Sequence, residues 1–215
     1  MAATHSTNAR IPKLWLVTDR HATVGRDLVA TVTRALDAGL PAVQLRDKDL
    51  SGRAIFALAE RLRAATARTG ALFVVNGRAD VARAVGADGV QLGSTTLPVD
   101  AVRAVAPGLI VGESVHDVET AAASRADFVV FGPVHDTPSK RSFGPSQGEA
   151  RLRDAAARTP APLLAIGGMD ATNAATALRA GAYGVAVIRA ILAASDPAAA
   201  TRELLRCIDA PQLAG

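Results

Sequence analysis

The sequence contains little cysteine and no long apolar run. Cys207 is the single cysteine among 215 residues, so no intramolecular disulfide can form, and a reducing cytoplasm is the expected location. No apolar run approaches the roughly 18 residues that a membrane span needs, and the first residues lack the charged-then-apolar order of a signal peptide. We therefore expect a cytoplasmic protein that is not embedded in a membrane.

Aromatic residues and blocks of like charge are also scarce. Aromatics make up 3% of the chain, and the formal net charge of +4 comes from arginines spread along the sequence. Surfaces that bind single-stranded nucleic acid usually interleave basic residues with stacking aromatics. We therefore expect no nucleic acid partner, and the balance of 49% hydrophobic and 20% charged residues predicts a folded globular chain.

Short apolar runs alternate with longer segments that are rich in alanine and arginine and have a helical period, which is typical of successive strand-helix units and a parallel sheet. Helices are expected to begin near Asp27, Ser51, Arg78, Pro98, Asp117, Gly148, Ala171 and Pro197. Eight apolar runs can be counted, at 14–18, 42–45, 72–76, 89–93, 109–114, 128–132, 162–168 and 184–188.

Eight units favour closure, so the sequence predicts an α/β fold with a single-domain (β/α)8 TIM barrel over residues 14–215, after a flexible tail at 1–13. An open doubly wound sheet is the alternative. It would need a glycine-rich phosphate turn after the first strand, where this chain has TDRHATVG.

Polar residues gather where the expected strands end, which is where barrels carry their active sites. Gln44, Arg46 and Lys48 alternate along the end of the second strand, so all three face one way, and they suit an anion or a carbonyl-bearing ring. The alternative is a solvated strand end whose charge Asp47 and Asp49 balance. Two further predicted substrate-binding residues end the third and fifth strands, Asn76 and Ser114.

Gly167 and Gly168 follow the seventh strand, where barrels often bind phosphate. Their backbone N–H groups can approach a phosphate closely, and a short helix beginning near Arg189, after Ile188, would point its positive end at the same place. A tight turn alone is the alternative explanation of the glycine pair. Gly167, Gly168, Ile188 and Arg189 together form the predicted phosphate site.

The long loop after the sixth strand adds the predicted substrate-binding residues Thr137, Ser139 and Lys140, on a segment able to close as a lid. His116 stands at the mouth of the fifth strand, where an imidazole can take and return a proton, and it is the predicted catalytic residue. A structural histidine is the alternative. No Cys/His cluster or carboxylate pair shows metal-ligand spacing, so we expect no metal site.

These residues lie in motifs that resemble the thiamine-phosphate synthase and thiazole tautomerase family of barrels. The resemblance runs from about Leu14 to Pro197, and its segments occur in the family's order: VQLRDK, VNGRADVARAVGADGVQLG, SVHDVETA, ADFVVFGPVHDTPSK, LLAIGGM and GAYGVAVIRAI.

The resemblance implies two possible branches. Synthases join a hydroxymethylpyrimidine pyrophosphate to thiazole phosphate, with magnesium held by one aspartate after the third-strand asparagine and another after the fourth strand. This chain has Gly77 and Thr96 at those positions. The NGR-D-A run and SVH are closer to the tautomerase branch, so we expect a thiazole tautomerase, an isomerase that needs no cofactor.

For a tautomerase, the resemblance implies that His116 moves the ring proton of a thiazole carboxylate phosphate. Gly167, Gly168 and Arg189 would hold the phosphate, although the family usually has a small residue in place of Arg189, and Arg46 or Lys48 would neutralise the carboxylate. The alternatives are a magnesium-dependent synthase, which Gln44, Arg46, Lys48 and Lys140 favour, and a barrel that binds a thiamine-related ligand without catalysis. The expected partner is a small phosphorylated thiazole, and a homo-oligomer is possible.

Overall fold

The structure, a computed structural model, describes residues 11–47, 49–136 and 146–210. Its elements are β1 (Leu14–Val17), η2 (Arg20–Ala22), α1 (Leu28–Asp37), β2 (Ala42–Leu45), α2 (Gly52–Thr69), β3 (Leu72–Asn76), α3 (Ala79–Ala84), β4 (Gly89–Leu92), α4 (Val99–Val105), β5 (Ile110–Val115), α5 (Val118–Ala123), β6 (Phe128–Phe131), α6 (Gly148–Arg158), β7 (Leu163–Ile166), α7 (Ala174–Arg179), β8 (Gly184–Val187), α8 (Arg189–Leu192) and α9 (Pro197–Asp209).

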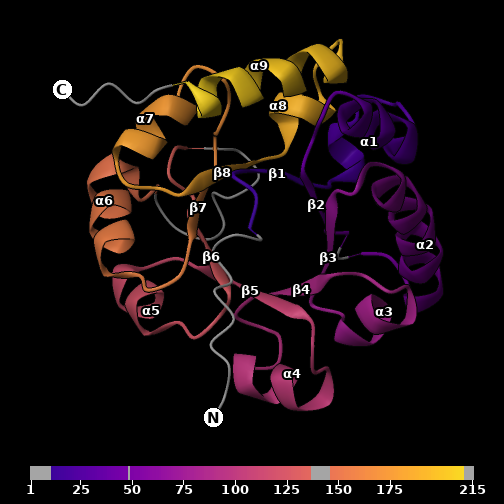
Figure 1. Ribbon diagram of the computed structural model, residues 1–215, viewed down its shortest axis with the longest axis horizontal. Coiled ribbons are helices and arrows are strands. Elements are labelled where there is room, and N and C mark those ends of the chain that lie inside the picture. The colour runs from indigo at the N-terminus through magenta and orange to yellow at the C-terminus, as the bar shows by residue number, and fades with distance from the viewer. Residues whose placement is uncertain (1–10, 48, 137–145, 211–215) are drawn as a thin grey trace.

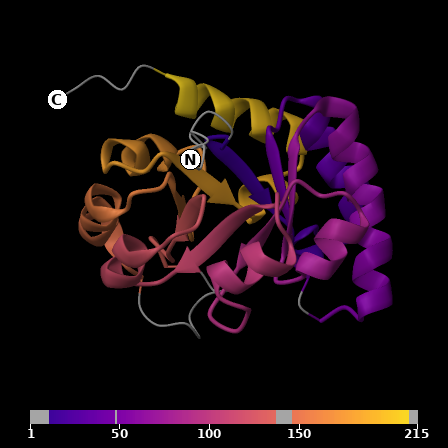
Figure 2. The ribbon, with the colours of Figure 1, turned by 60° about the horizontal axis from the view of Figure 1, so that its bottom comes forward.

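The eight strands form a closed parallel barrel in chain order, and β1 pairs with β8 to complete the ring. The helices surround the strands, and α9 packs between α1 and α7 (Figures 1 and 2). The predicted (β/α)8 barrel is confirmed, and every strand begins and ends within two residues of its expected bounds. Among the described residues, none of the helices is long and apolar enough to cross a membrane.

Side-chain caps explain where several helices begin. The carboxylates of Asp27 and Asp117 accept backbone N–H groups at 2.8 and 2.7 Å, and the Ser51 hydroxyl accepts one at 3.3 Å. Helix α7 begins three residues later than expected. Asp170 and Asn173 explain the delay, because their side chains accept hydrogen bonds from backbone N–H groups within the intervening turn.

The interior of the barrel is filled by alternate residues of the strands. Trp15 of β1 stacks on Phe128 of β6 in the buried interior, with the ring centroids 4.8 Å apart. The residues between them point outward and pack against the helices. The last inward residue of each strand therefore faces a common space at the carboxyl end of the barrel.

The barrel begins slightly before the boundary that the sequence suggested. Ile11 is buried within the inner core, and the carbonyl of Lys13 accepts the N–H of Val185 at 2.7 Å. Tyr183 donates its hydroxyl to the Ile11 carbonyl at 2.8 Å. Residues 11–13 thus pack against the barrel, and the remainder of the predicted tail lies outside the described residues.

A repeated aspartate ties strands together at their amino ends. Asp88, just before β4, accepts the N–H of Phe73 at 2.8 Å, and Asp127, just before β6, accepts the N–H of Val111 at 2.7 Å. Each carboxylate also pairs with an arginine, from α2 and α4 respectively. The same device holds two successive pairs of strands at the end of the barrel opposite the candidate site.

Val24, in the loop after η2, is a strained point of the backbone. Its φ is +55° and its exposed fraction is 69%, so a β-branched residue takes a left-handed conformation with little packing in return. We predict that Val24→Asn raises the free energy of unfolding by about 1 kcal/mol, because asparagine tolerates this conformation. Denaturant unfolding measures the change. Val105→Asn, at a similarly exposed position in a right-handed helix, is the control, and an equal gain there would contradict the explanation.

Candidate active site

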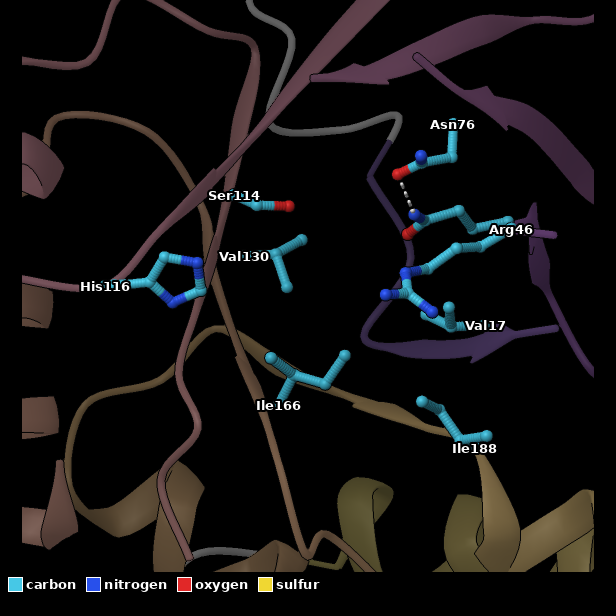
Figure 3. Close-up of a pocket in the computed structure, with 9 residues that line it drawn as sticks. Val17, Arg46, Asn76, Ser114, His116, Val130, Ile166 and Ile188 are labelled. Carbon is cyan, nitrogen blue, oxygen red and sulfur yellow. Dashed lines mark hydrogen bonds between the residues drawn. The ribbon is translucent and has the colours of Figure 1, made fainter. Parts of the chain in front are cut away.

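A pocket opens at the carboxyl ends of the strands, where barrels carry their sites (Figure 3). Its wall is polar where β2, β3 and β5 end and apolar where β6, β7, β8 and β1 end. Six of the predicted site residues line this pocket: Gln44, Arg46, Asn76, Ser114, His116 and Ile188. Three further residues also line it: Val17, Val130 and Ile166.

Two amide side chains connect neighbouring strands across the polar wall. Gln44 donates its Nε2 to Oδ1 of Asn76 at 3.2 Å, and Gln91 donates its Nε2 to Oγ of Ser114 at 2.9 Å. Asn76 and Gln91 are themselves partners in the register of β3 and β4. The Asn76 NH2 group and the Ser114 hydroxyl therefore retain hydrogen atoms that can be donated to a ligand, and Oε1 of Gln44 can accept.

Arg46 supplies positive charge to this pocket. Its side chain extends from the end of β2 toward the centre of the pocket, beside Val17 (Figure 3). Within the described part of the chain, no carboxylate lies within ion-pair distance of its guanidinium. An unbalanced guanidinium in a partly enclosed pocket favours an anionic ligand.

The neighbouring aspartates do not balance the charge of Arg46. Asp47 turns away from the pocket with its side chain 2% exposed, and it pairs with Arg20 at 3.3 Å. Asp49 also pairs with Arg20, through both of its oxygens. Burial raises the pKa of Asp47, whereas the hydrogen bonds from Arg20 hold the pKa of Asp49 well below its usual range. The alternative of a charge-balanced strand end therefore does not hold for Arg46.

His116 is held by the backbone of the adjacent strand. Its Nδ1 lies 2.5 Å from the carbonyl oxygen of Gly132, and because a carbonyl only accepts, Nδ1 carries the proton in this contact. In a neutral ring, Nε2 then bears the lone pair. The side chain lines the pocket beside Ser114 (Figure 3).

Packing accounts for both glycines of the predicted phosphate turn. Gly167 and Gly168 have φ values of +100° and +65°. A Cβ atom on Gly167 would lie 2.6 Å from Cα of Pro133, and one on Gly168 would lie 2.8 Å from Cβ of His135. The segment after β6 thus passes directly against the turn and requires glycine there without any ligand. Arg189 begins α8 as an exposed residue.

Sequence reasoning missed one polar residue and most of the apolar wall. Gln91 is fully buried and occupies the third position of GVQL, as Gln44 does in AVQL, so this shared spacing was the available signal. Val17, Val130 and Ile166 are ordinary strand residues whose sequence context carries no such signal. Four predicted ligands lie outside the described residues: Lys48, Thr137, Ser139 and Lys140.

Comparison with known proteins identifies the family. The family model described as thiamine monophosphate synthase matches residues 14–191. The chain is 45% identical over 195 residues to the thiamine-phosphate synthase of Roseiflexus castenholzii, covering 89% of this chain and 86% of the relative. It is 45% identical over 208 residues to that of Methanoculleus marisnigri, covering 94% and 98%. The chain belongs to the thiamine monophosphate synthase family.

A solved structure of the family agrees with the sequence comparison. Thiamine phosphate pyrophosphorylase from Pyrococcus furiosus superposes with a TM-score of 0.85 at 36% identity, over 92% of this chain and 95% of that one. The expectation of a thiazole tautomerase, and hence of an isomerase, is therefore wrong: these relatives are named as synthases or as a pyrophosphorylase. The departures at Gly77 and Thr96 are local, whereas the similarity to these synthases extends over 89% and 94% of the chain.

The two departures nevertheless lie together in space. A Cβ atom on Gly77 would be 3.2 Å from Cγ2 of Thr96, so aspartates at these positions could reach one ion. Here neither residue has a carboxylate. Among the described residues, no three His, Cys, Asp or Glu side chains gather closely enough to hold a metal. The residues present therefore do not form the magnesium site that the family resemblance implies.

We predict that restoring both carboxylates creates a magnesium site. Gly77→Asp combined with Thr96→Asp should give magnesium binding in calorimetric titration that the wild-type protein lacks, because two adjacent carboxylates are hard oxygen ligands. Aspartate also tolerates the φ of +69° at position 77. The matched control combines Gly77→Asn with Thr96→Asn, which keeps the shapes and removes the charges. Equal magnesium binding by the wild-type protein and the Asp variant would contradict the interpretation.

Proposed function

We propose that this protein joins a methylpyrimidine bearing a pyrophosphate to a thiazole phosphate, the reaction of a thiamine-phosphate synthase. The ring nitrogen of the thiazole attacks the methylene carbon of the pyrimidine. The bond from that carbon to the pyrophosphate oxygen breaks, and its electron pair leaves with the pyrophosphate. Family membership and the names of the relatives support this transferase reading.

The observation that carries the proposal is the guanidinium of Arg46 in the pocket. Negative charge accumulates on pyrophosphate as it departs, and a fixed cation lowers the barrier most where that charge develops. Arg46 has no acidic partner among the described residues, so its charge is available for this purpose. Lys48 and Lys140 remain predicted ligands of the same anion, and Thr137 and Ser139 remain predicted substrate-binding residues.

The polar wall of the pocket suits the hydrogen-bonding atoms of the substrates, and the apolar wall suits the surfaces of their rings. Pyrimidine ring nitrogens accept hydrogen bonds, and the Asn76 amide and the Ser114 hydroxyl can donate them. Val130, Ile166 and Ile188 offer apolar surface on which the rings can pack. We propose that the thiazole phosphate binds by the turn at Gly167 and Gly168, with Arg189, the first residue of α8, as a further cation.

The proposed reaction gives His116 a different task from proton transfer. Attack by the ring nitrogen forms the product without removing a proton from carbon, so the coupling step needs no general base. We propose that His116 forms part of the polar wall and helps to orient the substrates. We also propose that the coupling relies on side-chain charges without a carboxylate-held metal ion, and that the protein is cytoplasmic.

We predict that the purified protein forms thiamine phosphate and releases pyrophosphate from the two substrates, and that EDTA does not abolish the reaction. Arg46→Gln should lower the rate by roughly a hundredfold, the usual effect of removing one charge-stabilising donor. Chromatography of the product and a pyrophosphate-release assay measure both. Arg202→Gln, an exposed arginine on α9, is the matched control. Binding of both substrates without product would show a ligand-binding barrel and would refute the proposal.

We predict only a modest effect of replacing the histidine. His116→Asn should slow the coupling less than roughly tenfold, because a positioned general base contributes about a hundredfold or more and none is required here. Single-turnover kinetics with a pH series separates the two roles. A loss of a hundredfold in the single-turnover rate at unchanged substrate affinity would show that His116 transfers a proton.

A further inference from the structure

The residue that follows Arg46 in the chain carries a buried carboxylate. Asp47 follows Arg46 in the chain, and successive side chains of an extended segment point to opposite sides, so Arg46 enters the pocket while Asp47 is buried behind it. Burying a charge costs several kcal/mol unless its oxygens are well satisfied. The groups that hydrogen-bond to Asp47 therefore indicate which segments this buried carboxylate fixes.

Those partners come from the neighbouring strand and its loop. Oδ2 of Asp47 accepts the hydroxyl of Thr18 at 3.4 Å, and Oδ1 accepts the backbone N–H and Nη1 of Arg20 at 3.5 and 3.3 Å. Thr18 is fully buried and directly follows β1. Asp47 thus connects the end of β2 to the loop that follows β1.

Thr18 in turn binds the backbones of two pocket residues, Gln44 of β2 and Arg46 just after it. Its N–H donates to the carbonyl of Gln44 at 2.9 Å, and its Oγ1 accepts the N–H of Arg46 at 2.8 Å. The threonine hydroxyl therefore accepts from Arg46 and donates to Asp47 at once. These bonds fix the backbone from which the guanidinium of Arg46 extends.

Arg20 braces the same segment from the outside. Besides its bonds to Asp47, its guanidinium binds Asp49 through both nitrogens, with one pair 2.6 Å apart. Its side chain is 33% exposed, whereas those of Asp47 and Asp49 are 2% and 57% exposed. Arg20 therefore pairs with one buried carboxylate, that of Asp47, and with one exposed carboxylate, that of Asp49.

We propose that Thr18 and Asp47, braced by Arg20, are positioning residues that aim the guanidinium of Arg46 at the pyrophosphate. This inference rests on the proposed function only in taking the ligand of Arg46 to be a pyrophosphate group. None of the three touches the substrate. They set the affinity for the anion through the backbone of Arg46.

The threonine hydroxyl provides the first test. Thr18→Val keeps the shape and removes the hydroxyl, whereas Thr18→Ser keeps the hydroxyl, so the pair isolates the hydrogen bonds. Calorimetric titration with inorganic pyrophosphate should show affinity roughly tenfold lower for Thr18→Val, the scale of losing a support behind a binding residue. Thr18→Ser should restore most of it. In a coupling assay, KM for the pyrimidine pyrophosphate should rise in Thr18→Val and kcat should fall as well, because Arg46 also stabilises the charge that develops as pyrophosphate departs.

The two aspartates provide the second test, which holds even if Thr18→Val fails to fold. Asp47→Asn keeps an acceptor and removes a buried charge, so its melting temperature should not fall, while pyrophosphate affinity should drop roughly tenfold. Asp49→Asn weakens only the exposed ion pair with Arg20 and should change the affinity for pyrophosphate less than about twofold. A purely structural role would instead lower the melting temperature of Asp47→Asn and leave the affinity unchanged.

The outcomes distinguish this inference from the proposed function. If the wild-type protein binds pyrophosphate but forms no product, the synthase proposal fails, and the variants still decide the positioning role. Equal affinities for Thr18→Val and Thr18→Ser, or for Asp47→Asn and the wild type, would overturn the inference. So would a wild-type protein with no affinity for pyrophosphate.

Discussion

Closure of eight parallel strands around one interior is the constraint on which the rest of this structure depends. The pairing of β1 with β8 leaves no free edge, and the enclosed space must be filled by alternate side chains of every strand. Inward positions therefore continue to the carboxyl end, where those of β2, β3 and β5 change from apolar to polar. Gln44, Asn76 and Ser114 face one another because each is the next inward position above a buried residue on its own strand.

This constraint explains how much of the site the sequence could predict. Strand ends can be located from apolar runs, and polar residues at those ends must converge once the barrel closes. The sequence therefore predicts that Gln44, Arg46, Asn76, Ser114 and His116 lie together, and in the structure they line one pocket, whereas their roles stay predictions. The glycine turn after β7 was located too, but its packing against the segment after β6 depends on contacts between distant parts of the chain. The sequence alone does not reveal that approach.

The bracing network was out of reach for a related reason. Asp47 in the sequence RDKD resembles a solvated acid beside two cations, and only the fold shows that its side chain is buried against Thr18 and Arg20. The expectation of a tautomerase was wrong for a different reason. The substitutions at positions 77 and 96 change two residues of local motifs, whereas the identity of 45% to the named synthases extends over 89% and 94% of the chain.

Loss of the two family carboxylates need not leave the pocket short of positive charge. Removing two aspartates removes two negative charges, and the ion that they would have held carries two positive charges, so the net charge at this point is the same without both. The positive charge that the described residues supply to the pocket lies on the side chain of Arg46, whose position depends on covalent geometry and hydrogen bonds and not on the concentration of an ion in solution.

The repeated aspartates at the amino ends of β4 and β6 have an evolutionary consequence. Each ties a preceding strand to an arginine of a helix, and none of these groups lines the pocket. Stability is therefore anchored at one end of the barrel and chemistry is placed at the other, with a buried core between them. Descendants of such a chain can exchange residues such as those at positions 77 and 96 while the anchoring end stays intact. A lineage can then explore new reactions on an inherited scaffold in small, separately tolerated steps.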